Sequence, residues 1–419
     1  MKKRLLYIVA LIALGALLVA CGAPRVDLPP VPDHGGIGVR VISATEWYDY
    51  HPEVVTSFFN SDRTEFYSYL ELNPYKRVLF EGFGFALDYN SPRNHTFAME
   101  GLDMTGRYGF RARSNCFTCK SANYPAIREY MGVEFYAVPF EEMRAMMTQP
   151  VSCFNCHGNE PGVARAMAPY LHAALPTFEI AMISPGSIAC AQCHVEYHFD
   201  PNTFEVILPW QGGLATMYPT DVLYYFNNIA RDATGTLAFA DYVNPRSGVR
   251  QIKVQHPEFE TIYGRGAVHN SLAPLGMAFS CADCHMPHAE ARGVEYRSHN
   301  WVSPLNSPEL IAGSCAACHT DLYSEVRAIQ ARYYPAIHGF GQHLAELMER
   351  LVLAVESGRH SEATLDEIRY TFRNAQFFWD WVVSENSNGA HNSRLLFRTM
   401  EYGWDYAREV ERLLQQIGH

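Results

Sequence analysis

Paired cysteines constrain this chain more than any other feature of its 419-residue sequence. Ten of the eleven cysteines fall into five pairs, and in each pair two residues separate the cysteines. The pairs are Cys116/Cys119, Cys153/Cys156, Cys190/Cys193, Cys281/Cys284 and Cys315/Cys318. The remaining cysteine, Cys21, lies near the N-terminus. One motif is repeated five times and uses all cysteines except Cys21. This repetition predicts several copies of the same kind of site.

Four of the pairs are followed directly by histidine, and the first pair is followed by Lys120. The histidines are His157, His194, His285 and His319. C-x-x-C-H is the attachment sequence of c-type haem, in which both thiols bond to one porphyrin and the histidine ligates its iron. A thioredoxin-like redox pair, half of a zinc site and a disulfide framework are the alternatives. Four copies in one chain favour haem, and we predict five covalently bound haems c in all.

The first pair departs from the motif because Lys120 stands where the other pairs have histidine. One interpretation is a degenerate site whose haem is lost or is ligated from elsewhere. The other is a haem whose proximal ligand is the lysine amine, which must be deprotonated to bind iron and therefore needs a dry surrounding. An iron with this ligand and an open opposite face has the layout of a catalytic metal.

The N-terminal segment predicts export. Residues 1–20 begin with lysine and arginine, continue as an uncharged apolar run and end at Ala20, which is the layout of a signal peptide. A cysteine directly after the cleavage site is what a bacterial lipoprotein needs, so we expect a lipid on Cys21. An ordinary signal peptide and an N-terminal membrane anchor are the alternatives. Residues 21–41, rich in proline and glycine, read as a flexible tether.

The net charge limits the partners of the chain. It is -11 at pH 7 with neutral histidine, and haem propionates would add negative charge. A nucleic-acid-binding protein needs a basic face, so we expect no nucleic-acid partner. We expect an exported lipoprotein attached to a bacterial membrane and facing the periplasm or the cell exterior.

The order of the motifs resembles that of the pentahaem cytochrome c nitrite reductases that form ammonium. C-x-x-C-K is followed by four C-x-x-C-H, and the resemblance extends from about Trp47 to the end of the chain. Further local motifs carry it at Asp88–His95, Cys193–Tyr197, Lys253–Glu258, Cys284–Pro287 and Glu385–Ser387, with Gly389 and His391. The resemblance implies a single, mainly α domain over residues 42–419. Short helices and loops would wrap five haems, and long C-terminal helices would form a homodimer interface.

The resemblance also implies an active site at the haem of Lys120. The distal pocket of the family matches Arg107, Tyr197 and His256 in this sequence. Arg107 and His256 would hold the oxygens of nitrite, and His256 and Tyr197 would supply protons for its reduction to ammonium. Without the resemblance, a lone arginine is usually a surface group and a lone tyrosine usually half-buried.

A calcium ion beside this pocket is the next implication. Its ligands match the Glu196 carboxylate, the backbone carbonyls of Tyr197 and Lys253, and the side-chain carbonyl of Gln255. Oxygen ligands of this kind suit calcium. The ion would fix Tyr197 and His256 through the backbone.

Four distal histidines are needed if the other four haems are six-coordinate electron carriers. Matching to the family selects His95, His269, His299 and His391. The implied pairs are His299 with His157, His95 with His194, His391 with His285, and His269 with His319.

Three functions follow as alternatives. The first is nitrite reduction, with electrons from a quinol-oxidising membrane multihaem cytochrome or a soluble cytochrome. The second is a non-catalytic electron conduit, against which Arg107, Tyr197 and His256 speak. The third is a related multihaem enzyme that acts on hydroxylamine or a sulfur oxyanion.

The C-terminal third has the strongest helical pattern. Apolar residues recur at helical spacing over residues 344–355 and in a final helix from about residue 393. Gly358 fits the end of the first of these helices. Thr364 and Glu367 fit a capping box at the start of the next helix.

Overall fold

The computed structural model describes residues 40–61, 67–107, 112–210, 212–236, 238–267 and 279–419. They belong to one compact unit, Val39–His419, which is mainly helical. The predicted signal peptide, Cys21 and His269 lie outside the described residues and stay predictions. Within the described residues, no helix is both long and apolar enough to cross a membrane.

Short helices joined by loops make up the chain before residue 320, as predicted. The α-helices are α2 (Ala44–Trp47), α3 (Pro52–Phe59), α4 (Tyr69–Leu72), α5 (Lys76–Leu79), α6 (Gly84–Leu87), α7 (Ala98–Met104), α8 (Tyr124–Met131), α9 (Phe140–Arg144), α10 (Cys153–His157), α11 (Pro169–Ala174), α12 (Thr177–Met182), α13 (Pro185–Ala191), α14 (Pro219–Asn228), α15 (Glu258–Tyr263), α16 (Cys281–His285) and α17 (Pro308–Leu310). Single turns of other helix types are η1 (His95–Phe97), η2 (Ser114–Phe117), η3 (Gly132–Ala137), η4 (Gly213–Thr216), η6 (Pro304–Asn306) and η7 (Ile311–Cys315). Proline explains much of this segmentation, because it starts α3, α11, α13, α14 and α17. Proline fits the first turn of a helix and ends the preceding one.

Three small antiparallel hairpins interrupt the helices in the described part of the chain. They are β1 (His198–Phe199) with β2 (Val206–Ile207), β3 (Tyr242–Val243) with β4 (Arg250–Gln251), and β5 (His288–Ala291) with β6 (Val294–Arg297). The last hairpin turns through Arg292 and Gly293, both with positive φ, which suits a two-residue β-turn. In the second hairpin, Tyr242 pairs with Gln251, and the chain then runs directly into Lys253–His256.

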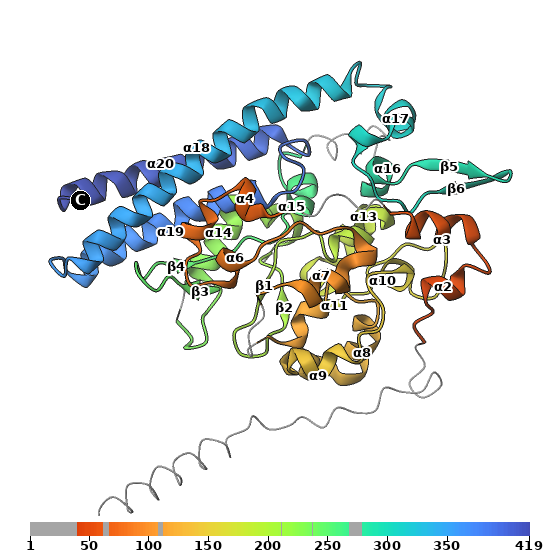
Figure 1. Ribbon diagram of the computed structural model, residues 1–419, viewed down its shortest axis with the longest axis horizontal. Helices are drawn as coiled ribbons and strands as arrows, with labels where there is room; N and C mark the ends of the chain where they lie inside the picture. Colours follow the sequence, from red (N-terminus) through yellow and green to blue (C-terminus); the bar gives the residue numbers. More distant parts are fainter. Residues whose placement is uncertain (1–39, 62–66, 108–111, 211, 237, 268–278) are drawn as a thin grey trace, which may run out of the picture. The chain divides into compact units, whose positions relative to one another are not determined.

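Three long helices, α18 (Leu322–Glu356), α19 (Glu362–Ser384) and α20 (Ser393–Gln416), pack against one another (Figure 1). Their buried faces form the main hydrophobic core, which includes Leu344, Leu351, Leu396 and Leu414. The predicted stripes and the start of the final helix are confirmed, and Gly358 follows the end of α18 with φ +63°.

The predicted capping box at Thr364 and Glu367 is wrong by one turn. Ser361 caps α19, because its hydroxyl accepts a hydrogen bond from the Thr364 backbone N–H. Thr364 is therefore already inside the helix. A serine three residues before a threonine offers two caps, and the local pattern does not separate them.

Gly403 of α20 lies where the three helices approach one another closely. A Cβ added there would lie 2.6 Å from the ring of Phe340 in α18 and 3.1 Å from Cβ of Phe378 in α19. We predict that Gly403→Ala lowers the free energy of unfolding by about 1–3 kcal/mol through overpacking. The measurement is a guanidinium unfolding curve of the haem-loaded protein.

Gly339→Ala in α18 is the matched control, because a Cβ there meets nothing within 4 Å. Alanine at an exposed helix position should stabilise the protein by up to about 1 kcal/mol. Equal stability of Gly403→Ala and the wild type would contradict this account of the packing.

Candidate haem and active site

Single helical turns carry two of the haem-attachment motifs. Helices α10 and α16 consist of C-x-x-C-H alone. Ser280 opens α16 in a capping box with Asp283, and before α10 the Ser152 backbone N–H donates to the Asn155 side chain at 2.9 Å. Residues three apart on a helical turn are neighbours on its surface, so the turn presents both thiols on one side. All ten motif cysteines are described, and none of them forms a disulfide.

The attachment sites lie next to one another in space. Helix α13 contacts both α10 and α16, and α16 contacts α17. The Cys119 thiol lies within interaction distance of that of Cys193, and the Cys190 thiol within interaction distance of that of Cys281. The fold therefore gathers motifs that are up to 165 residues apart in the sequence into one contiguous cluster.

The fifth motif is the one whose second cysteine is exposed in the described part of the chain. Cys318 is exposed, whereas the other nine motif cysteines are partly buried, and the side chain of His319 is 34% exposed. The physical reason is position, because Cys318 lies in the short turn between η7 and the start of α18, where both residues between the two cysteines are also exposed. An exposed thiol is still open to a porphyrin. Among the ten motif cysteines, Cys318 is the most exposed in the described part of the chain. The role of Cys318 in haem attachment stays a prediction.

Three of the four predicted histidine pairs come together. Ring centroids lie 6.1 Å apart for His157 and His299, 6.3 Å for His95 and His194, and 6.1 Å for His285 and His391. Two imidazoles that ligate one metal from opposite sides, each at about 2 Å, have ring centroids roughly 6 Å apart. The spacing of these pairs therefore fits two axial ligands of one iron. The fourth pair is not described, because its member His269 lies outside the described residues.

Hydrogen bonds at Nδ1 orient the rings as metal ligands require. Nδ1 lies 3.0 Å from the Val302 carbonyl in His285, 3.0 Å from the Arg297 carbonyl in His299 and 2.7 Å from the Glu325 carboxylate in His319. In His391 it bonds to the Glu385 carboxylate. Such bonds place the proton on Nδ1 and leave the Nε2 lone pair for a metal. The histidines present thus fit haem iron.

Burial keeps several of these rings neutral, as a metal ligand must be. It lowers the pKa of His95 to about 3 and the pKa values of His194 and His299 to about 4, with nearby positive groups adding to the effect. In His391 burial lowers the pKa, but the Glu385 carboxylate outweighs burial and raises the pKa to about 8.

The four predicted catalytic residues gather beside the first motif. Burial, and then the charges of Lys120, His194, Lys253 and Arg107, hold the pKa of His256 well below its usual value. Burial, followed by the Cys119 and Cys116 thiols, raises the pKa of Tyr197 well above its usual value, and Arg107 acts in the opposite direction. These mutual effects require the side chains to be close. The pocket thus combines a guanidinium, a neutral imidazole and a protonated phenol.

A short relay holds Arg107. Its Nε donates to the Thr105 hydroxyl at 3.2 Å, and that hydroxyl donates to Asp88 at 2.6 Å. The guanidinium also lies 4.6 Å from the ring of Phe85 and 5.6 Å from that of Tyr89. The side chain is therefore fixed along its length, with its terminal nitrogens left for a ligand.

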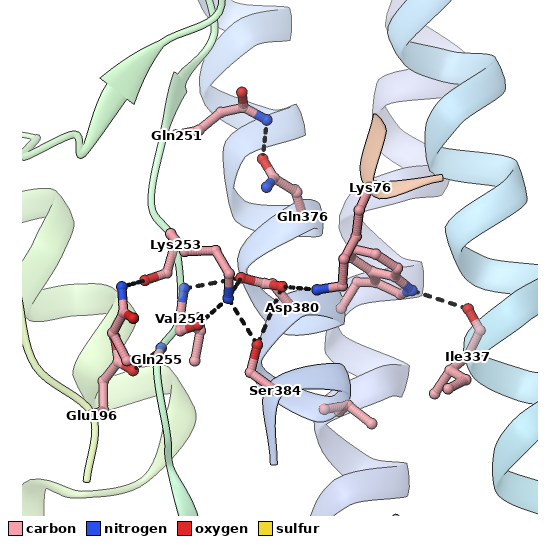
Figure 2. Close-up of polar contacts among 12 residues, drawn as sticks. Lys76, Glu196, Gln251, Lys253, Val254, Gln255, Ile337, Gln376, Asp380 and Ser384 are labelled. Atoms are coloured by element: carbon pink, nitrogen blue, oxygen red, sulfur yellow. Dashed lines mark hydrogen bonds and ion pairs between the residues drawn. The ribbon is translucent and has the colours of Figure 1, made fainter. Parts of the chain in front are cut away.

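Three of the four residues predicted to bind calcium, Glu196, Lys253 and Gln255, lie together (Figure 2). Glu196 is fully buried; its Oε2 accepts a hydrogen bond from the Gln255 backbone N–H at 2.6 Å, and its Oε1 has no hydrogen-bond partner. The Gln255 amide nitrogen donates to the Lys253 carbonyl at 3.0 Å. Turning the amide over, which hydrogen-bond networks alone decide, would place its oxygen beside that carbonyl. A buried carboxylate oxygen without a partner and two adjacent carbonyls fit a hard cation.

Sequence reasoning missed the residues that support the site. It gave no role to Asp88 and Thr105, to Glu385 behind His391, or to Asn386, whose amide lies 3.4 Å from His256 Nδ1. It also missed Asp380, a charged residue in the apolar run Phe377–Val382. A carboxylate within such a run signals a buried ion pair, and that signal was available.

Known proteins resemble this chain over nearly the whole of the predicted domain, residues 42–419. The sequence profile of the cytochrome c552 family matches residues 44–418. The chain belongs to the cytochrome c552 family. As a member of a family of c-type cytochromes, it binds haem covalently, and proteins of this kind are normally exported.

Relatives of the same family name cover most of the chain. Cytochrome c-552 of Desulfotalea psychrophila is 28% identical over 386 residues, covering 85% of this chain and 71% of the relative. Cytochrome c-552 of Aliarcobacter butzleri is 29% identical over 444 residues, covering 95% and 82%. The fold matches that of the cytochrome c nitrite reductase catalytic subunit from Desulfovibrio desulfuricans with a TM-score of 0.76, at 24% identity, over 89% of this chain and 86% of that chain. The mainly helical multihaem cytochrome fold predicted from sequence is confirmed.

Removal of a distal histidine should change the spin state of one haem in this cytochrome. We predict that His299→Ala adds a high-spin, five-coordinate signal to the absorption and electron paramagnetic resonance spectra, because His157 would then ligate alone. His172→Ala is the control, since His172 is exposed and its Nε2 bonds only a backbone carbonyl at 3.1 Å. Identical spectra of the two variants would contradict the pairing.

Proposed function

We propose that the protein is an ammonia-forming cytochrome c nitrite reductase whose active-site haem is bound by Cys116, Cys119 and Lys120. The observation that carries the proposal is that His256 lies within electrostatic reach of Lys120 and Arg107, and Tyr197 within reach of Arg107 and of the Cys116 and Cys119 thiols. An electron conduit needs no such pocket. The fold shared with a cytochrome c nitrite reductase supports the same function.

Each pocket residue has a defined task toward nitrite. Haem, when bound, supplies an iron that takes nitrite by its nitrogen and delivers electrons. The terminal nitrogens of Arg107 donate to the nitrite oxygens, because Nε is already engaged by Thr105. The positive charge of Arg107 also draws an anion into a chain whose net charge is -11.

His256 and Tyr197 handle protons. The Asn386 amide donates to His256 Nδ1, so the proton of the neutral ring lies on Nε2, which donates to a nitrite oxygen. The raised pKa of Tyr197 keeps its phenol protonated, and it serves as a second donor for oxygens that leave as water. Reduction of nitrite to ammonium takes six electrons and eight protons and releases two waters.

Electrons reach the pocket through the other haems. The thiol contacts Cys119–Cys193 and Cys190–Cys281 support direct neighbours at the first, third and fourth motifs. The fourth and fifth motifs are also close, because α16 contacts α17, which runs directly into η7 and Cys315. We infer that electrons enter from a quinol-oxidising membrane multihaem cytochrome or a soluble cytochrome and pass along these bis-histidine haems. Cys318 of the fifth motif is exposed in the described part of the chain, which suits the approach of an electron donor there.

The remaining parts of the proposal concern calcium, the membrane and assembly. One calcium ion is held by Glu196, Tyr197, Lys253 and Gln255, which fits the unpartnered Glu196 oxygen. The Desulfovibrio desulfuricans enzyme has two calcium sites in its catalytic subunit. We also propose a lipid on Cys21, attachment to the bacterial membrane on the periplasmic or outer side, and a homodimer through the C-terminal helices.

The test of the reaction is the yield of ammonium per nitrite consumed. Haem-loaded protein with an artificial reductant and no oxygen should give a ratio near one, because the six-electron reaction has no other nitrogen product. Little nitrite consumption by protein whose haems are all reducible would favour the electron conduit instead.

The Arg107 relay gives a sharper prediction. Thr105→Val should raise the KM for nitrite by about tenfold, since loss of a hydrogen bond to a charged group costs about 1.5 kcal/mol or more. Thr105→Ser, which keeps the hydroxyl, should retain the wild-type KM. Equal KM values for Thr105→Val and Thr105→Ser would remove the relay from substrate binding.

A further inference from the structure

A buried group of three charges joins α19 to the segment that carries the proposed calcium ligands (Figure 2). Asp380 of α19 is fully buried, and Lys76 and Lys253 are each 1% exposed. Asp380 Oδ1 lies 3.0 Å from Lys76 Nζ, and Oδ2 lies 2.8 Å from Lys253 Nζ. Two ammonium groups thus share one carboxylate in the protein interior.

Aromatic faces surround the excess positive charge. Lys76 Nζ lies 5.1 Å from the ring centre of Tyr89 and 5.2 Å from that of Trp379. Lys253 Nζ lies 5.4 Å from Phe85 and 5.5 Å from Tyr89. Cation–π attraction of desolvated ammonium groups stabilises this arrangement. The rings of Phe85 and Tyr89 also contact Arg107, so the charge group and the proposed substrate arginine pack on the same two side chains.

Asp380 binds the backbone of Val254 as well as the side chains of Lys76 and Lys253. Its Oδ2 accepts a hydrogen bond from the Val254 N–H at 2.9 Å. Lys253 Nζ donates further to Ser384 Oγ at 2.9 Å and to the Val254 carbonyl. Residues 253 and 254 are therefore held to α19 at three points.

The segment held in this way leads directly into the proposed site. The Lys253 carbonyl accepts from the Gln255 amide, the Gln255 N–H donates to Glu196, and His256 follows. A rotation of the backbone at Lys253 would move the carbonyl away from Glu196 and turn the next side chains with it. Groups behind metal ligands commonly fix ligand orientation in this manner.

We propose that Asp380 is a positioning residue that fixes Lys253 and Val254, so that the Lys253 carbonyl and the Gln255 side chain face Glu196 and His256 faces the haem of Lys120. The effect of Asp380 on nitrite turnover rests on the proposed function. The effect of Asp380 on calcium binding does not depend on nitrite reduction. Lys76 serves as a second counter-charge, which donates to the other carboxylate oxygen of Asp380 from α5.

The test compares two variants of the haem-loaded full chain. Asp380→Asn combined with Lys76→Met keeps the buried net charge of the wild type at +1, because one negative and one positive charge are removed together. Lys76→Met alone leaves a balanced Lys253–Asp380 pair. The readouts are the Kd for calcium after chelator treatment, by competition with a fluorescent chelator, and kcat and KM for nitrite.

We expect the double variant to raise the calcium Kd at least about tenfold, the usual effect of losing a group behind a metal ligand. Its kcat for nitrite should fall, and added calcium should restore part of it. Lys76→Met alone should keep the calcium Kd of the wild type. A double variant that is loaded with haem and binds calcium like the wild type would overturn the proposal.

A further variant and two wild-type controls separate the possible outcomes. If the double variant does not load haem, Ser384→Ala removes the hydroxyl that accepts from Lys253 and donates to Asp380 at 3.3 Å; a raised calcium Kd supports the proposal and an unchanged one overturns it. Absence of nitrite consumption by the wild type itself would count against the proposed function alone, because the calcium comparison does not use that reaction. A wild-type chain that binds no calcium would overturn the positioning role.

Discussion

Covalent attachment of haem to paired cysteines is the constraint on which the rest of this structure depends. The attachment turns α10 and α16 have five residues each, and helices of that length are marginal in water by themselves. The Ser280 cap of α16, the contacts of both turns with α13 and the large apolar surface of each porphyrin hold them in place. This explains why a chain of this length can form one compact unit from short helices. Its main side-chain core is centred on the C-terminal helices, and earlier residues such as Leu79 of α5 and Phe226 of α14 join it.

The C-terminal helices act as the rigid support of the site. The α18–α20 core is closely packed at Gly403, and Trp379 of α19 donates a hydrogen bond to the Ile337 carbonyl of α18 at 3.0 Å. From this support Asp380 reaches the 253–256 segment, and Glu385, just beyond the end of α19, reaches His391. One helix thus orients both a proposed distal haem ligand and the backbone behind the proposed calcium site. Mutations in α19 would therefore alter haem ligation and calcium binding at residues with which the mutated side chains make no direct contact.

The sequence predicted what depends on local pattern. The paired cysteines, the apolar stripes of α18 and α20 and the glycine after α18 are all short-range signals, and the structure agrees with them. The cap of α19 was misplaced because two hydroxyl residues compete within one turn. The exposure of Cys318 could not be read from a motif that is the same at buried and exposed sites. The apolar run around Asp380 signals a buried charge, but its partners could not be named from the sequence: Asp380 binds Lys76 across 304 positions and Lys253 across 127, and only the folded backbone brings them together.

The site at Cys116–Lys120 decides the account, because the pocket of Arg107, Tyr197 and His256 has a function only if a haem stands before it. Mass spectrometry of the protease fragment that contains Cys116 and Cys119 measures this directly. The account predicts a fragment with one haem added to both sulfurs, in protein whose other four motifs are also loaded. A fragment with unmodified thiols or a disulfide, while the other four motifs carry haem, would contradict it.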